Sequence, residues 1–70
     1  MKTKFHYVIL RDIPGFRSCY LNYDRDRDSQ VVSSYPRLFE SETVASLSAS
    51  NFTDRYGGKA SVHEVEINHP

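Results

Sequence analysis

The sequence predicts a small α+β domain: an antiparallel sheet of three to four strands with one helix packed on one face, in the order β-β-β-α-β. Two observations carry this prediction. The segment from Phe39 to Ile67 reads as a capped, serine-rich helix, a Gly-Gly stop and an alternating strand. Before it, two segments rich in β-branched and aromatic residues flank a Pro-Gly turn. The 70 residues suit a single domain spanning residues 1–70.

The first strand is predicted at Lys4–Arg11, a segment rich in β-branched and aromatic residues. Because side chains alternate along a strand, Phe5, Tyr7 and Ile9 share one face. The other face is also largely apolar. A strand that is apolar on both faces is typical of a central position in a sheet.

The turn at Asp12–Gly15 carries Pro and Gly at its two centre positions, a strong turn signal. The second strand is then predicted at Ser18–Tyr23, with Cys19, Leu21 and Tyr23 on one face. The short turn makes the first two strands a hairpin.

A charged loop, Asp24–Asp28, separates this hairpin from a short third strand predicted at Gln30–Ser33. Pro36 lacks a backbone N–H and disfavours continuation of a paired strand. Tyr35–Phe39 is therefore interpreted as a crossover that leads to the helix.

The helix is predicted to begin after Ser41, a good N-cap residue, and to end at the Gly57-Gly58 pair. Leu47 falls on its polar side. At about 100° per residue, one core-facing stripe is expected. It comprises Val44, Ala45, Ser48, Ala49, Phe52 and Tyr56.

The last strand is predicted at Lys59–Asn68, with His63, Val65 and Ile67 on one face. Because a single helix covers one face of the sheet, the other face and at least one strand edge are expected to stay partly open. Both are natural places for a partner.

The composition excludes several function classes. Nine Lys+Arg against nine Asp+Glu give a net charge of zero, so no overall field draws the chain to nucleic acid or to an anionic membrane. The single Cys19 allows no intramolecular disulfide, which favours a reducing, cytoplasmic location. The apolar run Tyr7–Leu10 is far too short to span a bilayer, and the N-terminus lacks the apolar core of a signal peptide.

No segment predicts an enzyme, a cofactor or a metal site. Asp24–Asp28 has the spacing of the start of a calcium loop, but Ser29 stands where that loop needs glycine and Tyr35 where it needs glutamate. The histidines form no local metal-ligand pair, and no nucleophile elbow or phosphate-binding glycine loop exists. The charged loop is therefore either a solvated turn or a polar contact loop.

Arginine and tyrosine are the residue types that point to binding. Arginines outnumber lysines two to one. Both Tyr and Arg are enriched at protein-binding hot spots, and both also bind single-stranded nucleic acid. The neutral charge favours a protein partner. The predicted partner-binding residues, in or near the hairpin and the charged loop, are Tyr20, Tyr23, Arg25, Arg27 and Tyr35.

The layout resembles small accessory proteins of phages and other mobile elements. The resemblance lies in a leading strand (Tyr7 to Leu10), a hairpin return (Cys19 to Leu21), a capped helix (Phe39 to Ala45) and a closing strand (Val62 to Ile67). Such proteins commonly bind and block a host protein, as anti-CRISPR and anti-restriction proteins do. They share no common motif, so the resemblance assigns no site residue.

The sequence and this resemblance together predict a non-enzymatic protein-binding module, in particular a phage-type inhibitor of a host or defence protein such as a CRISPR nuclease. The alternative is a single-stranded nucleic-acid-binding protein that uses the same Arg/Tyr surface. A homodimer is compatible with either function, because a small core and a zero net charge favour self-association.

Overall fold

The computed structural model describes residues 1–15, 17 and 19–68. These residues form a four-stranded antiparallel sheet and one helix, which confirms the predicted α+β class and element order. The elements are β1 (Lys2–Arg11), β2 (Cys19–Asp24), β3 (Ser29–Ser33), α1 (Glu42–Tyr56) and β4 (Lys59–Asn68). Ser18, the predicted start of the second strand, lies outside the described residues.

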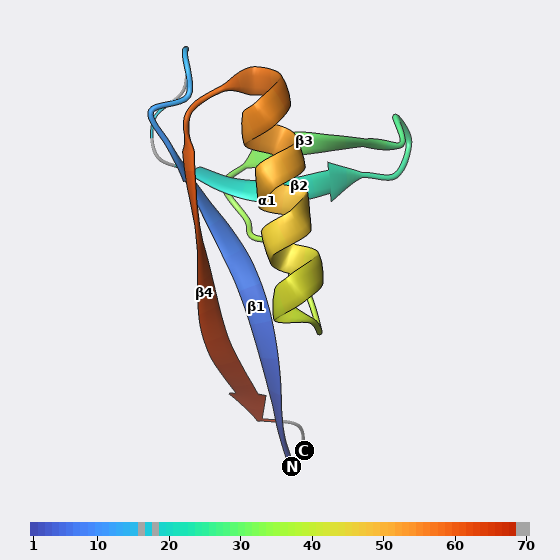
Figure 1. The fold of residues 1–70 in the computed structure, drawn as a ribbon. Coiled ribbons are helices and arrows are strands. Elements are labelled where there is room, and N and C mark those ends of the chain that lie inside the picture. Colours follow the sequence, from blue (N-terminus) through green and yellow to red (C-terminus); the bar gives the residue numbers. More distant parts are fainter. Residues whose placement is uncertain (16, 18, 69–70) are drawn as a thin grey trace.

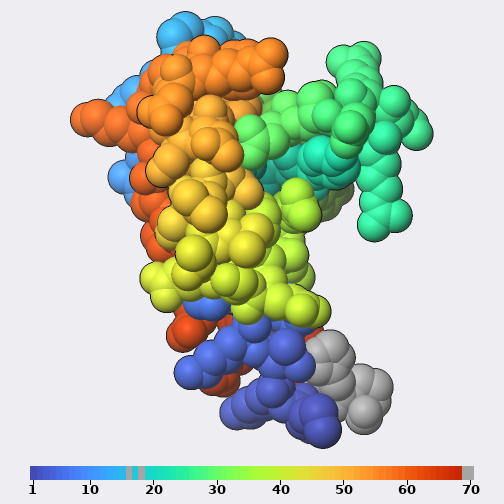
Figure 2. Space-filling view, turned by 45° about the vertical axis from the view of Figure 1, so that its right-hand side comes forward, coloured from blue at the N-terminus to red at the C-terminus, as the bar shows by residue number. Residues whose placement is uncertain are grey.

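The strand order is β3-β2-β1-β4, so β1 is central, as its two apolar faces predict. β1 and β4 pair along their whole length, from Lys2 opposite Asn68 to Arg11 opposite Lys59. Figure 1 shows these two long strands side by side, with the start of β1 and the end of β4 at the same end of the molecule. The β2–β3 hairpin runs across them and stands out from the body as an arm (Figures 1 and 2).

The predicted crossover joins the sheet. Within the described residues β1 and β2 pair over two rows next to the turn, and the strands then diverge. The chain around residues 37–39 lies between them. The Arg37 amide donates to the Leu21 carbonyl at 3.1 Å, while Phe39 and His6 exchange two backbone hydrogen bonds of 2.8 Å. This insertion satisfies backbone groups that the diverging strands would otherwise leave unpaired.

The core lies between α1 and one face of the sheet. Val8 and Leu10 on β1 are fully buried, and Leu21 on β2 is 1% exposed. Among the described residues, the buried set is Val8, Leu10, Ile13, Leu21, Phe39, Ala45, Ala49 and Phe52. The Gln30 side-chain amide also donates to the Ser48 carbonyl at 3.0 Å, which ties β3 to the middle of the helix.

The core-facing stripe of the helix is narrower than predicted. Ala45, Ala49 and Phe52 are buried, but Val44 and Tyr56 are each 49% exposed. The two alanines have small side chains and mark the line of closest approach to the sheet. Val44 lies at one margin of the predicted arc, in the first turn of the helix, whereas Tyr56 lies within the arc but is the last residue of the helix.

The helix begins and ends where its sequence predicts. The Ser41 hydroxyl accepts a hydrogen bond from the Val44 amide at 3.3 Å. Gly57 and Gly58 have φ of 82° and 83°, which favour glycine, and the Gly57 amide donates to the Thr53 carbonyl at 2.8 Å. In the described part of the chain, no helix is long and apolar enough to cross a membrane.

Phe39→Ala should leave the domain largely unfolded even without denaturant, because emptying this core position costs about 3 to 5 kcal/mol and one core of this size supplies no more than that. Phe39 is 4% exposed, whereas its neighbour Leu38 is 40% exposed. Urea denaturation followed by circular dichroism measures the change. Leu38→Ala serves as the matched control and should cost less than about 1 kcal/mol. Equal losses in the two variants would contradict this account of the core.

Gly58→Ala should destabilise the fold more than Gly57→Ala, by at least about 1 kcal/mol. Both glycines have a left-handed φ, so both variants carry backbone strain. A Cβ at Gly58 would also lie 2.7 Å from Ile13 Cγ1 and 2.8 Å from the Arg11 carbonyl oxygen. At Gly57 a Cβ would meet no atom within 4 Å. Thermal unfolding of both variants tests the difference, and a smaller loss for Gly58→Ala would refute it.

Candidate functional site

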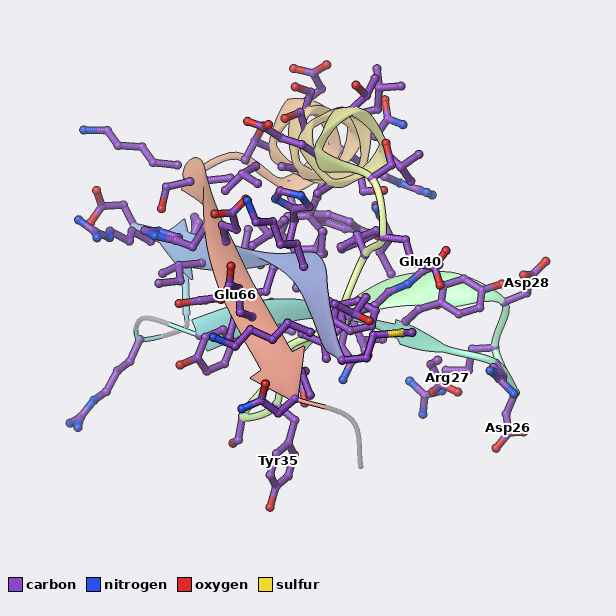
Figure 3. The ribbon with its side chains drawn as sticks, turned by 90° about the horizontal axis from the view of Figure 1, so that it is seen from below. Asp26, Arg27, Asp28, Tyr35, Glu40 and Glu66 are labelled. Atoms are coloured by element: carbon purple, nitrogen blue, oxygen red, sulfur yellow. The ribbon has the colours of Figure 1, made fainter. Side chains whose placement is uncertain are left out.

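The side of the sheet that faces away from α1 carries a band of apolar side chains, here called the open face. Because side chains alternate along a strand, the β1 residues that alternate with buried Val8 and Leu10 point to this side. The helix covers the opposite side only (Figure 3). The apolar members of the open face on β1, β2 and β4 are all half-buried, and they are Phe5, Tyr7, Ile9, Tyr20, Val65 and Ile67.

Strand register brings these side chains together. Phe5 is directly opposite Val65, and Ile9 is directly opposite Tyr20. The Tyr7 ring lies edge-on to the Tyr20 ring, with the centroids 6.0 Å apart. On β4, the His63 ring stacks on the Tyr7 ring, with the two ring centroids 5.4 Å apart. Three strands therefore contribute to one surface with aromatic rings at its centre.

One end of the open face is basic. Arg11 and Lys59 are opposite each other at the end of the β1–β4 pair and both are exposed. With Ala60, Ser61 and His63 they line a shallow depression of about 220 Å³. The open face thus combines an apolar band with two cationic side chains at one end.

The Ser61 hydroxyl lies 2.9 Å from His63 Nε2. A nucleophilic serine needs a base that a third group orients, normally a carboxylate. In the described part of the chain His63 makes its ring contact with Tyr7 and has no carboxylate partner. The arrangement therefore fits a contact surface better than an acyl-transfer site.

Two of the five predicted binding residues lie on the side of the open face. Tyr20 is part of the face itself. Tyr35 is 75% exposed and projects on the side opposite the helix (Figure 3). Its carbonyl accepts from Asn22 Nδ2 at 3.0 Å, and its amide donates to Ser33 Oγ at 3.1 Å. Since Ser33 is opposite Tyr20 in the sheet, these bonds hold Tyr35 close to the open face.

Tyr23 lies on the other side of the sheet, because it is three residues from Tyr20 on the same strand. Its hydroxyl donates to the Asp28 carboxylate. The Arg37 guanidinium lies over its ring, 5.3 Å from the centroid. These contacts indicate that Tyr23 supports the hairpin arm, and that Tyr20 and Tyr23 do not share a surface.

Arg25 and Arg27 are exposed in the turn between β2 and β3. Figure 3 shows Arg27 at the tip of the hairpin arm, to the side of the β1–β4 pair. Arg27 Nε is 3.7 Å from the Asp24 carboxylate, which also accepts from the Asp26 amide at 3.0 Å. The Asp24 carboxylate is thus engaged in the turn itself. No group of three or more metal-ligating side chains converges among the described residues.

No protein-family model matches this chain, and no curated protein or solved structure matches it significantly. The assignment of a candidate site therefore rests on the geometry of the fold.

A second hollow, of about 320 Å³, lies on the helix side beside the outer edge of β3. It is lined by Ile13, Pro14, Gln30, Val31, Val32, Phe52 and Tyr56. The lining is mostly apolar, and its Gln30 amide already donates to the Ser48 carbonyl. A ligand site normally adds a few polar groups that orient the ligand. The hollow therefore ranks below the open face as a candidate site.

Sequence reasoning missed Arg11, Lys59 and most of the apolar band as site residues. The alternation of Phe5, Tyr7 and Ile9 was a usable signal, since it defines one face of the first strand. The missing information was the pairing of β1 with β4, which sets Arg11 beside Lys59.

Alkylation of Cys19 should be several-fold slower in the folded protein than in the urea-unfolded chain. Cys19 packs against the core, and its burial raises the pKa of the thiol, so less thiolate is present at a given pH. Iodoacetamide labelling at pH 8 measures the rate.

The folded state also keeps the Cys19 thiol proton to higher pH than the unfolded state does, because burial raises the pKa of this thiol. Stability should therefore fall above the ordinary thiol pKa, and Cys19→Ala should remove this contribution.

Proposed function

We propose that this chain is a non-enzymatic protein-binding module whose contact surface is the open face. The observation that supports this most is the apolar band centred on Tyr7 and Tyr20, on the side of the sheet away from the helix. The members of this band are half-buried, and contiguous apolar surface that stays partly exposed on a small protein is typical of an interaction site.

The composition of the open face suits protein recognition. Its aromatic rings supply large contact area with little conformational entropy to lose, and its aliphatic members supply area that excludes water. Tyr35, at the margin, is held by two hydrogen bonds of its backbone while its side chain stays exposed. A side chain placed in this way is a suitable anchor for a partner.

The size of the core gives a further reason to expect a partner. Eight residues of the described part of the chain are buried on the helix side of the sheet. Two of them are alanines of the helix, which contribute little apolar area. A domain of this size gains only about 3 to 5 kcal/mol from one core. A target that covers the open face would add stability through binding.

The narrower proposal is that the module acts in the cytoplasm by blocking a host or defence protein, such as a CRISPR nuclease. The support for this is the resemblance of the layout to phage accessory proteins. An inhibitor of this kind acts through a contact surface, and the open face is the surface that we propose for this role.

The alternative function is binding of single-stranded nucleic acid. The observation that favours it is the cluster of rings formed by Tyr7, Tyr20 and His63, together with the cations Arg11 and Lys59 at the same face. Bases stack on aromatic rings, and cations track the phosphates. A salt-dependent affinity for oligonucleotides would separate this function from protein binding.

Tyr20→Ala should abolish capture of the target while leaving the fold intact. The measurement is a tagged pull-down from native lysate, with and without nuclease, read by mass spectrometry. We expect one dominant protein that survives nuclease, is retained by Leu47→Ala and is lost with Tyr20→Ala. Leu47 is the control because it is 59% exposed and lies on the helix, on the opposite side of the sheet.

Circular dichroism decides whether the loss comes from the surface or from the fold. Ile67→Ser, near the end of β4, is a second open-face variant for the case in which Tyr20→Ala unfolds. Capture that persists in both folded variants would contradict the proposed surface. Prey that disappears with nuclease would instead establish nucleic-acid binding.

A further inference from the structure

We propose that the partner presents an acidic, apolar protein segment: its apolar side chains cover the band around Tyr7 and Val65, and a carboxylate is bound between Arg11 and Lys59. This inference rests on the proposed function, since it names the chemistry of the partner at the same face. It is carried by the distribution of charge over the two sides of the sheet.

The chain is neutral overall, but the charged side chains of β1 and β4 are divided unequally between the two sides of the sheet. On the open face their charged side chains are Arg11 and Lys59, which lie opposite each other. The acidic residues of β4, Glu64 and Glu66, alternate with the open-face residues and lie on the other side. Lys2 Nζ, on that other side, is 4.0 Å from the Glu66 carboxylate. On these two strands the open face therefore carries positive charge in a protein of zero net charge.

The cations at this end are available to a partner. Lys59 Nζ is 4.0 Å from the Asp12 carboxylate, but the two side chains are 82% and 73% exposed. An ion pair so exposed has little free energy to lose on exchange. Arg11 has no ion pair with a described acidic residue. An Arg guanidinium and a Lys ammonium side by side can bind one carboxylate from two directions.

A second copy of this chain is a poorer occupant. Packed face to face, a second copy would offer Asp12, which already lies 4.0 Å from its own Lys59 Nζ, and Asp24 of β2, which follows Tyr20 and Asn22 on the same side. The Asp24 carboxylate is also engaged, 3.7 Å from Arg27 Nε and 3.0 Å from the Asp26 amide nitrogen. Two copies packed face to face would therefore bring together cations without free matching acids, which opposes association.

Nucleic acid is also a poorer occupant than an acidic protein segment. A strand of nucleic acid carries a phosphate at every nucleotide, and its affinity comes mainly from many cationic contacts. The open face has two strong cations at one end and aliphatic side chains along the rest, at Ile9, Val65 and Ile67. That pattern matches one or two carboxylates next to apolar side chains.

The test compares two double charge reversals, each of which replaces two cationic side chains and breaks one exposed ion pair. The first is R11E/K59E on the open face. The control is K2E/K4E, which reverses two exposed lysines of β1 on the other side of the sheet. Each double variant loses one exposed ion pair, Lys59–Asp12 or Lys2–Glu66. Circular dichroism checks that both variants fold.

The probes are a labelled random copolymer of glutamate and tyrosine, polyglutamate and oligothymidylate, and fluorescence anisotropy gives the dissociation constants. We expect wild type and K2E/K4E to bind the copolymer equally, and R11E/K59E to bind it at least about tenfold more weakly. Polyglutamate and oligothymidylate should bind wild type more weakly than the copolymer. No binding of the copolymer, equal loss in both variants, or tighter binding of oligothymidylate would each overturn the inference.

The same variants in the lysate pull-down separate this inference from the proposed function. A target that Tyr20→Ala loses but R11E/K59E retains would refute the acidic partner and leave the binding module standing. A target that both variants retain would refute the open face as the contact surface, and with it both proposals. Loss in Tyr20→Ala and R11E/K59E, with retention in K2E/K4E, supports both.

Discussion

The insertion of the chain around Arg37 and Phe39 between β1 and β2 is the interaction on which the rest of the structure depends. The two strands pair next to their turn and then diverge, and the inserted segment bonds to Leu21 on one side and His6 on the other. Phe39 is buried in the core, and the Arg37 guanidinium lies 4.7 Å from the centroid of its ring. This short segment thus bridges the two strands, contributes one side chain to the core and leads to Ser41, the N-cap of the helix.

This geometry separates the surfaces of the molecule. Because β2 diverges from β1, the hairpin arm projects sideways and carries its charged tip away from the body (Figures 1 and 2). The helix, placed directly after the insertion, covers only the side of the sheet that carries Val8 and Leu10. The opposite side keeps its apolar band, and Tyr35 is held at its margin by Asn22 and Ser33.

The open face shows how a neutral chain can still present a directional surface. Alternation along β4 places Lys59 on one side of the sheet and Glu64 and Glu66 on the other. Pairing with β1 then adds Arg11 next to Lys59. Net charge describes the field far from a protein, whereas a partner in contact meets the charges of one face. Apolar contact supplies affinity at such a face, and charge supplies selectivity.

The sequence by itself determined the element order, the helix from Ser41 to the glycine pair, the central first strand and the sharing of a face by Phe5, Tyr7 and Ile9. These features depend on local periodicity, capping and turn chemistry, which neighbouring residues specify. Only the tertiary structure decided the insertion at Phe39, the narrow helix stripe, and the separation of Tyr23, Arg25 and Arg27 from Tyr20 and Tyr35. Those features depend on the register and divergence of strands far apart in the sequence, and no local pattern encodes which residues then meet.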